Sequence, residues 1–197
     1  MTLLSLKYAK HIVLLAAALL AHTAQAATAT AIFAGGCFWC TESDFEKLPG
    51  VLAAESGYTA GKVPNPSYKA VSAGTTGHTE AVRVTYDPAK VTYSQLVEYF
   101  WKTIDPSEKD KQFCDSGSQY RSGIYWGSDA ERQTATASRD ALLKTGRFKT
   151  IHTELAAAST FYPAEEYHQD YYKKNPLRYA YYRNGCGRDA QLGRIWK

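Results

Sequence analysis

The chain has 197 residues, 21% of them charged, and a formal net charge of +4 to which Lys7 and Lys10 contribute two. No run of basic residues forms a nucleic-acid-binding tract, so nucleic acid is not expected as a partner. The length suits one domain with its own hydrophobic core, and we find no internal repeat and no long linker.

The first 26 residues have the features of a secretory signal peptide. Lys7 and Lys10 precede the apolar run HIVLLAAALLA, and Ala24 to Ala26 supply small residues before a cleavage position. An uncleaved anchor is the alternative, but the run is short for a bilayer and no stop-transfer pattern follows. We therefore expect signal peptide 1–26, a single domain over 27–197 without a stable membrane span, and export, with the periplasm as the expected destination.

Hydrophobic periodicity and turn residues divide the remaining chain into strands and helices. The segment HTEAVRVTYD alternates between apolar and polar residues, which is typical of a half-buried strand. Thr92 and Gln95 have the spacing of a helix capping box, as do Ser128 and Glu131. In chain order we expect strand 30–34, helix 37–48, strand 51–60, loop 61–68, strand 78–87, helix 92–104, polar loop 105–120, strand 122–127, helix 129–146, strand 151–158 and a short helix within 162–176.

This order of elements predicts the fold class. Strand, helix, strand, strand, helix, strand is the order of a ferredoxin-like unit, and a further helix and strand follow it. We expect an α+β two-layer sandwich with a mixed sheet and a ferredoxin-like core.

Cys37 lies where a strand, a Gly-Gly pair and a helix meet, in the segment FAGGCFWCTE. Unpaired backbone N–H groups and the helix dipole favour an anion at a helix N-terminus. Such a position lowers a cysteine pKa from about 8.5 to roughly 3.5–7.5. We expect Cys37 to be a nucleophile. A structural or metal-binding pair with Cys40 is the alternative, although the other Cys and His residues are too scattered for a zinc site.

Other side chains could complete a site around Cys37. Phe38 and Trp39 are suited to enclosing a small apolar group such as a methyl, although core packing is their more usual role. Glu80 falls on the buried face of its strand by alternation, and a buried carboxyl stays protonated at neutral pH. A solvent-exposed Glu80 at the strand end is equally compatible with the pattern.

The polar loop CDSGSQYRSG contains Asp115, Gln119, Tyr120 and Arg121. Loops of this length inside a compact domain are often functional, but a turn stabilised by an Asp115–Arg121 pair is also compatible. Tyr68, after Asn-Pro-Ser, is one of fifteen tyrosines and carries little signal by itself.

Six motifs occur together in this chain: GGCFW, GYTAG, NPSY, GHTEAVRVTYDP, DSGSQYRSGIY and YHQDYY. In this order, over roughly residues 30–175, the chain resembles the peptide-methionine (S)-S-oxide reductases, the A-type methionine sulfoxide reductase family. The resemblance implies a reductase that repairs oxidised proteins, acting on free or protein-bound methionine S-sulfoxide without a metal or organic cofactor. It also implies a thioredoxin-like reductant.

The resemblance assigns roles to matching positions. Cys37 would attack the sulfoxide sulfur, Phe38 and Trp39 would hold the methyl group, and Glu80 would protonate the oxygen. Tyr68 and Tyr120 would hydrogen-bond the same oxygen, and Asp115 would organise the pocket. The chemistry agrees with the residue-level interpretation, because a thiolate and a neutral acid must coexist. Attack leaves methionine and a sulfenic acid on Cys37.

A second thiol must then condense with the sulfenic acid to form an intramolecular disulfide. We expect this resolving cysteine to be Cys186, whose neighbours Gly185 and Gly187 would let the C-terminal segment swing toward Cys37. Cys40 and Cys114 are competing candidates, because many family members carry Gly and Asn at these positions.

Two other functions are compatible with the cysteines alone. The pair Cys37 and Cys40 could form the CxxC site of a thioredoxin-like oxidoreductase, although no proline loop of that fold is evident. An exported chain also meets an oxidising compartment, so two structural disulfides in a non-enzymatic domain are possible. A domain of this size does not need such crosslinks.

Overall fold

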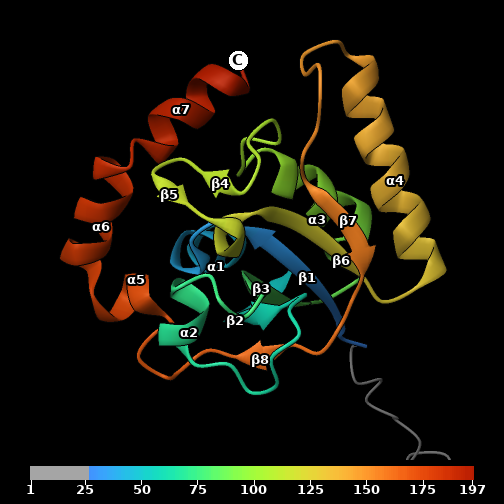
Figure 1. The fold of residues 1–197 in the computed structure, drawn as a ribbon. Helices are drawn as coiled ribbons and strands as arrows, with labels where there is room; N and C mark the ends of the chain where they lie inside the picture. Colours follow the sequence, from blue (N-terminus) through green and yellow to red (C-terminus); the bar gives the residue numbers. More distant parts are fainter. Residues whose placement is uncertain (1–26) are drawn as a thin grey trace, which may run out of the picture.

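A computed structural model describes residues 27–197, and the predicted signal peptide lies outside the described residues. A six-stranded mixed sheet with the order β7-β6-β1-β3-β2-β8 forms the centre (Figure 1). Strands β6, β1, β3 and β2 pair antiparallel in the ferredoxin-like order, and β7 joins β6 in parallel. The predicted α+β sandwich with a mixed sheet and ferredoxin-like core is confirmed.

The main sheet contains six strands: β1 (Ala29–Gly35), β2 (Val51–Thr59), β3 (Thr79–Tyr86), β6 (Ser122–Trp126), β7 (Glu154–Ala157) and β8 (Tyr162–Pro163). A two-stranded ribbon, β4 (Lys111–Gln112) and β5 (Asp115–Ser116), lies in the predicted polar loop with the 3-10 turn η1 (Ser118–Tyr120). The helices are α1 (Phe38–Phe45), α2 (Tyr68–Ser72), α3 (Tyr93–Trp101), α4 (Asp129–Lys144), α5 (Tyr171–Lys174), α6 (Pro176–Gly185) and α7 (Arg188–Ile195).

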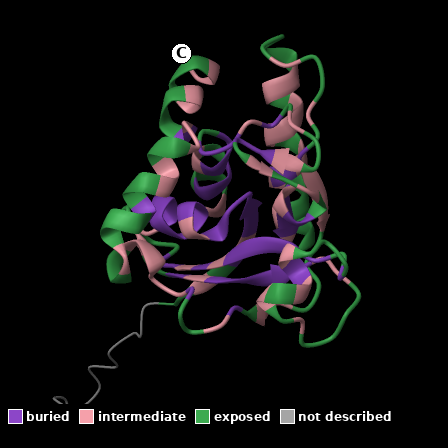
Figure 2. Cartoon of the chain, turned by 60° about the vertical axis from the view of Figure 1, so that its left-hand side comes forward, coloured by how far each residue is buried: buried purple, intermediate pink, exposed green. Residues whose placement is uncertain are grey.

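The core lies between the sheet and helices α1 and α3, and α4 packs beside α3. Phe33 of β1 is fully buried, with its ring centroid 4.8 Å from that of Phe45 and 5.1 Å from that of Phe100. Figure 2 shows the buried residues concentrated in the sheet and the helix against it, while the outer helices expose one side. Burial of this apolar surface is the main stabilising contribution to the fold.

Both predicted capping positions begin helices, but only one is a complete capping box. At α3 the Thr92 hydroxyl accepts from the Gln95 N–H, and the Gln95 side chain accepts from the Thr92 N–H. At α4 the Ser128 hydroxyl accepts from the Glu131 N–H, whereas the Glu131 carboxylate accepts from the N–H of Gly127. The Glu131 carboxylate therefore bonds the N–H of the residue before the N-cap, and the predicted capping box at Ser128 is only half formed.

The C-terminal segment differs from the expected swinging tail. Helices α6 and α7 run along one side of the domain, next to α1 and the β4–β5 ribbon (Figure 1). Arg188, at the start of α7, is 2% exposed. Gly185 ends α6, and Gly187 adopts a φ of 64° as the residue before α7. The two glycines therefore form a turn between docked helices. Among residues 27–197, no helix has the length and apolar character needed to cross a bilayer.

Candidate active site

A small cavity of about 70 Å³ lies at the N-terminus of α1. Seven of the eight residues that line it are the ones predicted from the sequence: Cys37, Phe38, Trp39, Tyr68, Glu80, Asp115 and Tyr120. The eighth, Tyr182 of α6, was not predicted. Residues from six separate elements and one cap position thus meet at one point.

The Gly-Gly pair makes the turn that presents Cys37. Gly36 has a φ of +83°, and a Cβ at this position would lie 2.5 Å from the Cβ of Gln112. Only glycine fits both the backbone conformation and the space. Cys37 follows as the N-cap of α1, and its carbonyl accepts the N–H of Thr41 at 3.2 Å.

Glu80 is buried, as the alternation of its strand predicted, with 2% of its surface exposed. Its Oε2 accepts the Phe38 N–H at 3.0 Å. Burial raises the pKa of the Glu80 carboxyl to about 8, although the Phe38 hydrogen bond works in the opposite direction. Glu80 can therefore hold a proton at neutral pH beside Cys37.

The expectation that the helix N-terminus lowers the Cys37 pKa is wrong for the resting site. Burial raises the pKa of the Cys37 thiol well above its ordinary value, and contacts with Cys40 and the Glu80 charge raise it further. The N–H of Phe38, in the first turn of α1, donates to Glu80 instead of to the Cys37 sulfur. The interaction with the Tyr182 hydroxyl is the one contribution that lowers the Cys37 pKa.

Phe38 and Trp39 form the apolar side of the cavity. The Trp39 indole stacks on Tyr171 with 3.7 Å between centroids, and its N–H donates to His168 Nδ1 at 3.0 Å. Both partners belong to the motif YHQDYY, whose residues we had not assigned to the site. The indole is therefore held on one face and at its polar edge, which fixes its orientation.

The two predicted tyrosines keep their protons. Burial raises the pKa of Tyr68 to about 12, and burial also raises that of Tyr120. Tyr68 is anchored through its N–H, which donates to Glu165 Oε1 at 2.9 Å. Both hydroxyls can act as hydrogen-bond donors in the cavity at neutral pH.

Three polar residues of the loop, Asp115, Gln119 and Arg121, make different contacts. Arg121 pairs with Glu154 at 3.0 Å, so the alternative turn with an Asp115–Arg121 pair is not formed. Gln119 donates to the Ser72 carbonyl at 2.9 Å and joins the loop to α2. Asp115 instead accepts a hydrogen bond from the Tyr182 hydroxyl.

The four cysteines form two different pairs. Cys114 and Cys186 are joined by a disulfide, whereas Cys37 and Cys40 are both free and buried. A hydrogen bond with Cys37 lowers the Cys40 pKa to about 7, opposed by burial and assisted by the charges of Arg188 and Arg183. The structure therefore places the free thiol of Cys40 beside the free thiol of Cys37.

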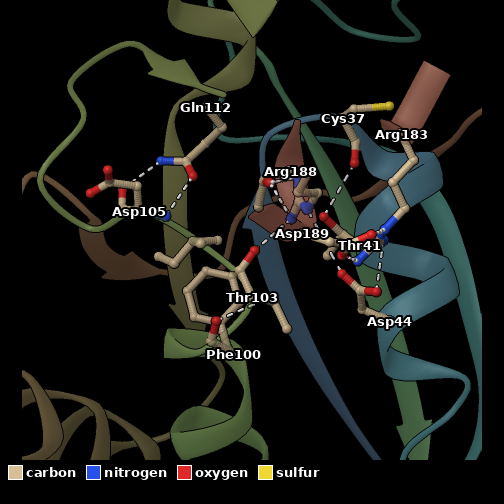
Figure 3. A network of polar contacts seen from close by, with 12 residues as sticks. Cys37, Thr41, Asp44, Phe100, Thr103, Asp105, Gln112, Arg183, Arg188 and Asp189 are labelled. Carbon is tan, nitrogen blue, oxygen red and sulfur yellow. Dashed lines mark hydrogen bonds and ion pairs between the residues drawn. The ribbon is translucent and has the colours of Figure 1, made fainter. Parts of the chain in front are cut away.

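A network of charged side chains connects the C-terminal helices to the Cys37 turn (Figure 3). The Arg188 guanidinium donates to the carbonyls of Gly35, at 3.1 and 3.2 Å, and Thr103, at 2.7 Å. Arg183 pairs with Asp44 of α1 at 2.8 Å. The end of β1 and the helix that follows Cys37 are thus both attached to the C-terminal segment.

The geometry agrees with the comparisons to known proteins. Residues 29–197 match the family described as peptide methionine sulfoxide reductase. The chain is 51% identical over 191 residues to the peptide methionine sulfoxide reductase MsrA 2 of Caulobacter vibrioides, covering 94% of this chain and 97% of that one. The chain belongs to the peptide methionine sulfoxide reductase family.

Solved structures agree with this assignment. Methionine sulfoxide reductase A of Corynebacterium diphtheriae is 36% identical, with a TM-score of 0.70 and coverage of 78% of each chain. Reduced Mxr1 of Saccharomyces cerevisiae is 34% identical, with a TM-score of 0.71 and coverage of 78% of this chain and 88% of that one. Mxr1 in complex with Trx2 aligns at a TM-score of 0.52 and 25% identity, over 75% of this chain and 86% of that one.

The chain is accordingly an enzyme that reduces methionine sulfoxide, and the resemblance read from its six motifs is confirmed. The thioredoxin-like and non-enzymatic alternatives are not supported. The strand order of the sheet is ferredoxin-like, which does not fit a thioredoxin-like fold. A non-enzymatic domain with two structural disulfides does not fit either, because Cys114–Cys186 is formed while Cys37 and Cys40 are free.

Proposed function

We propose that Cys37 is the nucleophile and Glu80 the acid in the reduction of methionine S-sulfoxide. The Cys37 thiolate attacks the sulfoxide sulfur while Glu80 protonates the oxygen. Cleavage of the sulfur–oxygen bond releases methionine and leaves the oxygen on Cys37 as a sulfenic acid. The observation that carries this proposal is the buried Glu80 carboxyl, with its pKa raised to about 8, in the same cavity as Cys37.

The cavity supports a substrate that enters only by the end of its side chain. A volume of about 70 Å³ is small beside the ~300–1,000 Å³ of pockets that enclose drug-sized ligands. Phe38 and Trp39 would hold the methyl group, with Tyr68 and Tyr120 donating to the oxygen. Free methionine sulfoxide and a residue in an oxidised protein both offer this group, so both are proposed substrates in protein repair.

Cys40, Cys114 and Cys186 remain the candidates for resolving the sulfenic acid. In the described state Cys114 and Cys186 are bonded to each other, so either could act only after that disulfide opens. Cys40 is free, lies beside Cys37 and has a pKa of about 7. We propose that Cys40 resolves first, expelling water as its sulfur bonds to Cys37, and that the predicted role of Cys186 is confined to later thiol exchange.

Residues 1–26 support an exported, periplasmic enzyme, which needs an electron donor outside the cytoplasm. A thioredoxin-like protein is the proposed reductant, because the yeast relative has been solved in complex with Trx2. The Cys114–Cys186 disulfide supports this, since Cys114 is exposed and could be attacked by an external thiolate. N-terminal sequencing of the protein from a periplasmic fraction tests the export proposal, and a start at Met1 would contradict it.

Single-turnover reduction tests the catalytic proposal. The mature protein, with reduced Cys37 and no external reductant, should form at least one methionine per chain from methionine S-sulfoxide, and Cys37→Ser should form none. In Cys40→Ser the first methionine should still form and a sulfenic acid should accumulate, whereas Cys186→Ser should not accumulate it. Sulfenic acid in Cys186→Ser but not in Cys40→Ser would assign the resolving role to Cys186.

A further inference from the structure

Tyr182 is the residue of the cavity that neither the motifs nor the resemblance accounts for. Helix α6 places its ring against Trp39, at an interplanar angle of 82° and a centroid distance of 5.8 Å. Its hydroxyl donates to Asp115 Oδ2, and Tyr182 lines the same cavity as Cys37, with which its hydroxyl interacts. One phenol thus connects the sulfur that must lose a proton with a carboxylate that can accept one.

The Cys114–Cys186 disulfide holds the two ends of this connection together. Cys114 immediately precedes Asp115, and Cys186 lies one turn after Tyr182, with its N–H donating to the Tyr182 carbonyl at 2.9 Å. The disulfide brings the two Cα atoms to 5.0 Å. The segment that carries the carboxylate and the helix that carries the phenol are therefore covalently joined next to the cavity.

The resting state of Cys37 creates the need for such a connection. Burial opposes ionisation of the thiol, and the thiol has almost no contact with solvent into which a proton could leave. Titratable groups face Cys37 from α1, β3, α2, β5, η1 and α6, namely Cys40, Glu80, Tyr68, Asp115, Tyr120 and Tyr182. Of these, only Tyr182 favours the thiolate.

We propose that Tyr182 transfers the Cys37 proton to Asp115 and then stabilises the thiolate by donating its own hydrogen bond to the sulfur. In the starting state the Cys37 S–H donates to the Tyr182 oxygen and the Tyr182 O–H donates to Asp115. Transfer breaks the Cys37 S–H and the Tyr182 O–H and forms a new O–H on Tyr182 and another on Asp115. Two protons move, one along each hydrogen bond, so Cys37 loses one proton, Asp115 gains one and no electron changes hands.

Two features of Asp115 and Tyr182 fit a concerted transfer. Burial raises the pKa of Asp115, which makes it a better proton acceptor than an exposed aspartate, while the Tyr182 hydrogen bond and Arg188 of α7 oppose this effect. Burial also raises the pKa of Tyr182 well above its ordinary value, so a tyrosinate is not an intermediate. The charge of the site stays constant during the transfer, which suits a cavity shielded from water.

This inference rests on the proposed role of Cys37, and it is tested by the pH dependence of Cys37 alkylation. The mature chain carries Cys40→Ser and is kept under non-reducing conditions, so that Cys37 is the free thiol and the Cys114–Cys186 disulfide is intact. Tyr182→Phe should raise the apparent Cys37 pKa by about one unit, which is a roughly tenfold slower reaction with iodoacetamide below that pKa. Asp115→Asn should raise it similarly, and the double variant should add little.

Tyr181→Phe is the matched control, because Tyr181 is 85% exposed on the same helix and should leave the titration unchanged. An unchanged titration in Tyr182→Phe overturns the proposal. A shift in Tyr182→Phe without one in Asp115→Asn also overturns it, because Asp115 would then not be the acceptor.

Single-turnover methionine formation separates this proposal from the proposed function. Tyr182→Phe should still form one methionine per chain, but more slowly than the wild-type chain at the same pH, with Glu80 protonated in both. Failure of the wild-type chain to form methionine at any pH would instead overturn the role of Cys37, whatever the titration shows.

Discussion

The segment Gly35–Glu42 and the helices α6 and α7 contribute to the same site in opposite ways. The first is a local structure, in which two glycines, a cysteine and a helix start follow one another in the chain. The second reaches the site only through tertiary contacts, with Arg188 on the Gly35 carbonyl and Tyr182 on Asp115. The comparison shows that the turn that presents Cys37 is encoded locally, while the protonation state of Cys37 depends on residues from distant parts of the chain.

The largest expected effect tests the proposed acid, which β3 brings to the first of these segments. Glu80→Gln keeps the shape of the side chain but cannot donate an acidic proton, so kcat should fall by about 10²–10⁴-fold. With the Glu80 pKa at about 8, the wild-type rate should decline as pH rises through that value, because the proton donor is lost. Glu55→Gln is the control: Glu55 lies half-exposed on β2, and its replacement should change neither the rate nor its pH dependence. The pH–rate profiles of the two variants and the wild-type chain test both expectations.

The next effect concerns the covalent link of the C-terminal segment. Replacing Cys114 and Cys186 together by serine opens a loop with a sequence separation of 72. Loop-closure entropy predicts a loss of about 4 kcal/mol in the free energy of unfolding. Urea denaturation under non-reducing conditions measures it. A loss well below 1 kcal/mol would mean that the unfolded chain already keeps the segments around Cys114 and Cys186 close together.

Breaking the charged network should cost somewhat less. Arg188→Met removes the donors to Gly35 and Thr103 and the positive charge near Asp44, so the free energy of unfolding should fall by about 3 kcal/mol. The loss of charge should also raise the Cys40 pKa, since Arg188 favours its thiolate. Arg194→Met, at an exposed position of α7, is the control. Equal stability of the two variants would contradict a structural role for Arg188.

The smallest effect lies far from the site. Thr92→Ala removes the side-chain half of the α3 capping box and should lower the free energy of unfolding by about 1 kcal/mol. Thermal unfolding measures the change, and single-turnover activity at a temperature well below the transition should stay at the wild-type level. A loss of activity there would show that α3 influences the cavity.

Much of the fold and most of the site could be predicted because their signals are local. Alternation placed Glu80 on the buried face, capping residues began α3 and α4, and the Gly-Gly turn placed Cys37 at a helix start. The direction in which the Cys37 pKa is shifted could not be predicted. It depends on burial and on which group accepts the hydrogen bond of the Phe38 N–H.

Helices α6 and α7 were not predicted from the sequence, because their signals are also tertiary rather than local. The segment LRYAYYRNGCGRDAQLGRIWK has no strong apolar stripe, because its contacts are made by tyrosine hydroxyls and arginine guanidinium groups. Which partner each of these groups finds depends on the tertiary fold, not on spacing along the chain. Tyr182 could not be distinguished from fourteen other tyrosines before the structure placed it.

The small volume of the cavity has a consequence for which oxidised residues are repaired. A pocket of about 70 Å³ encloses the end of one side chain and leaves the substrate backbone outside. An oxidised methionine within a folded protein must therefore first protrude, so its rate of repair should follow the local opening equilibrium of its host. Under this condition the enzyme selects among damaged proteins by their local stability rather than by the sequence around the methionine.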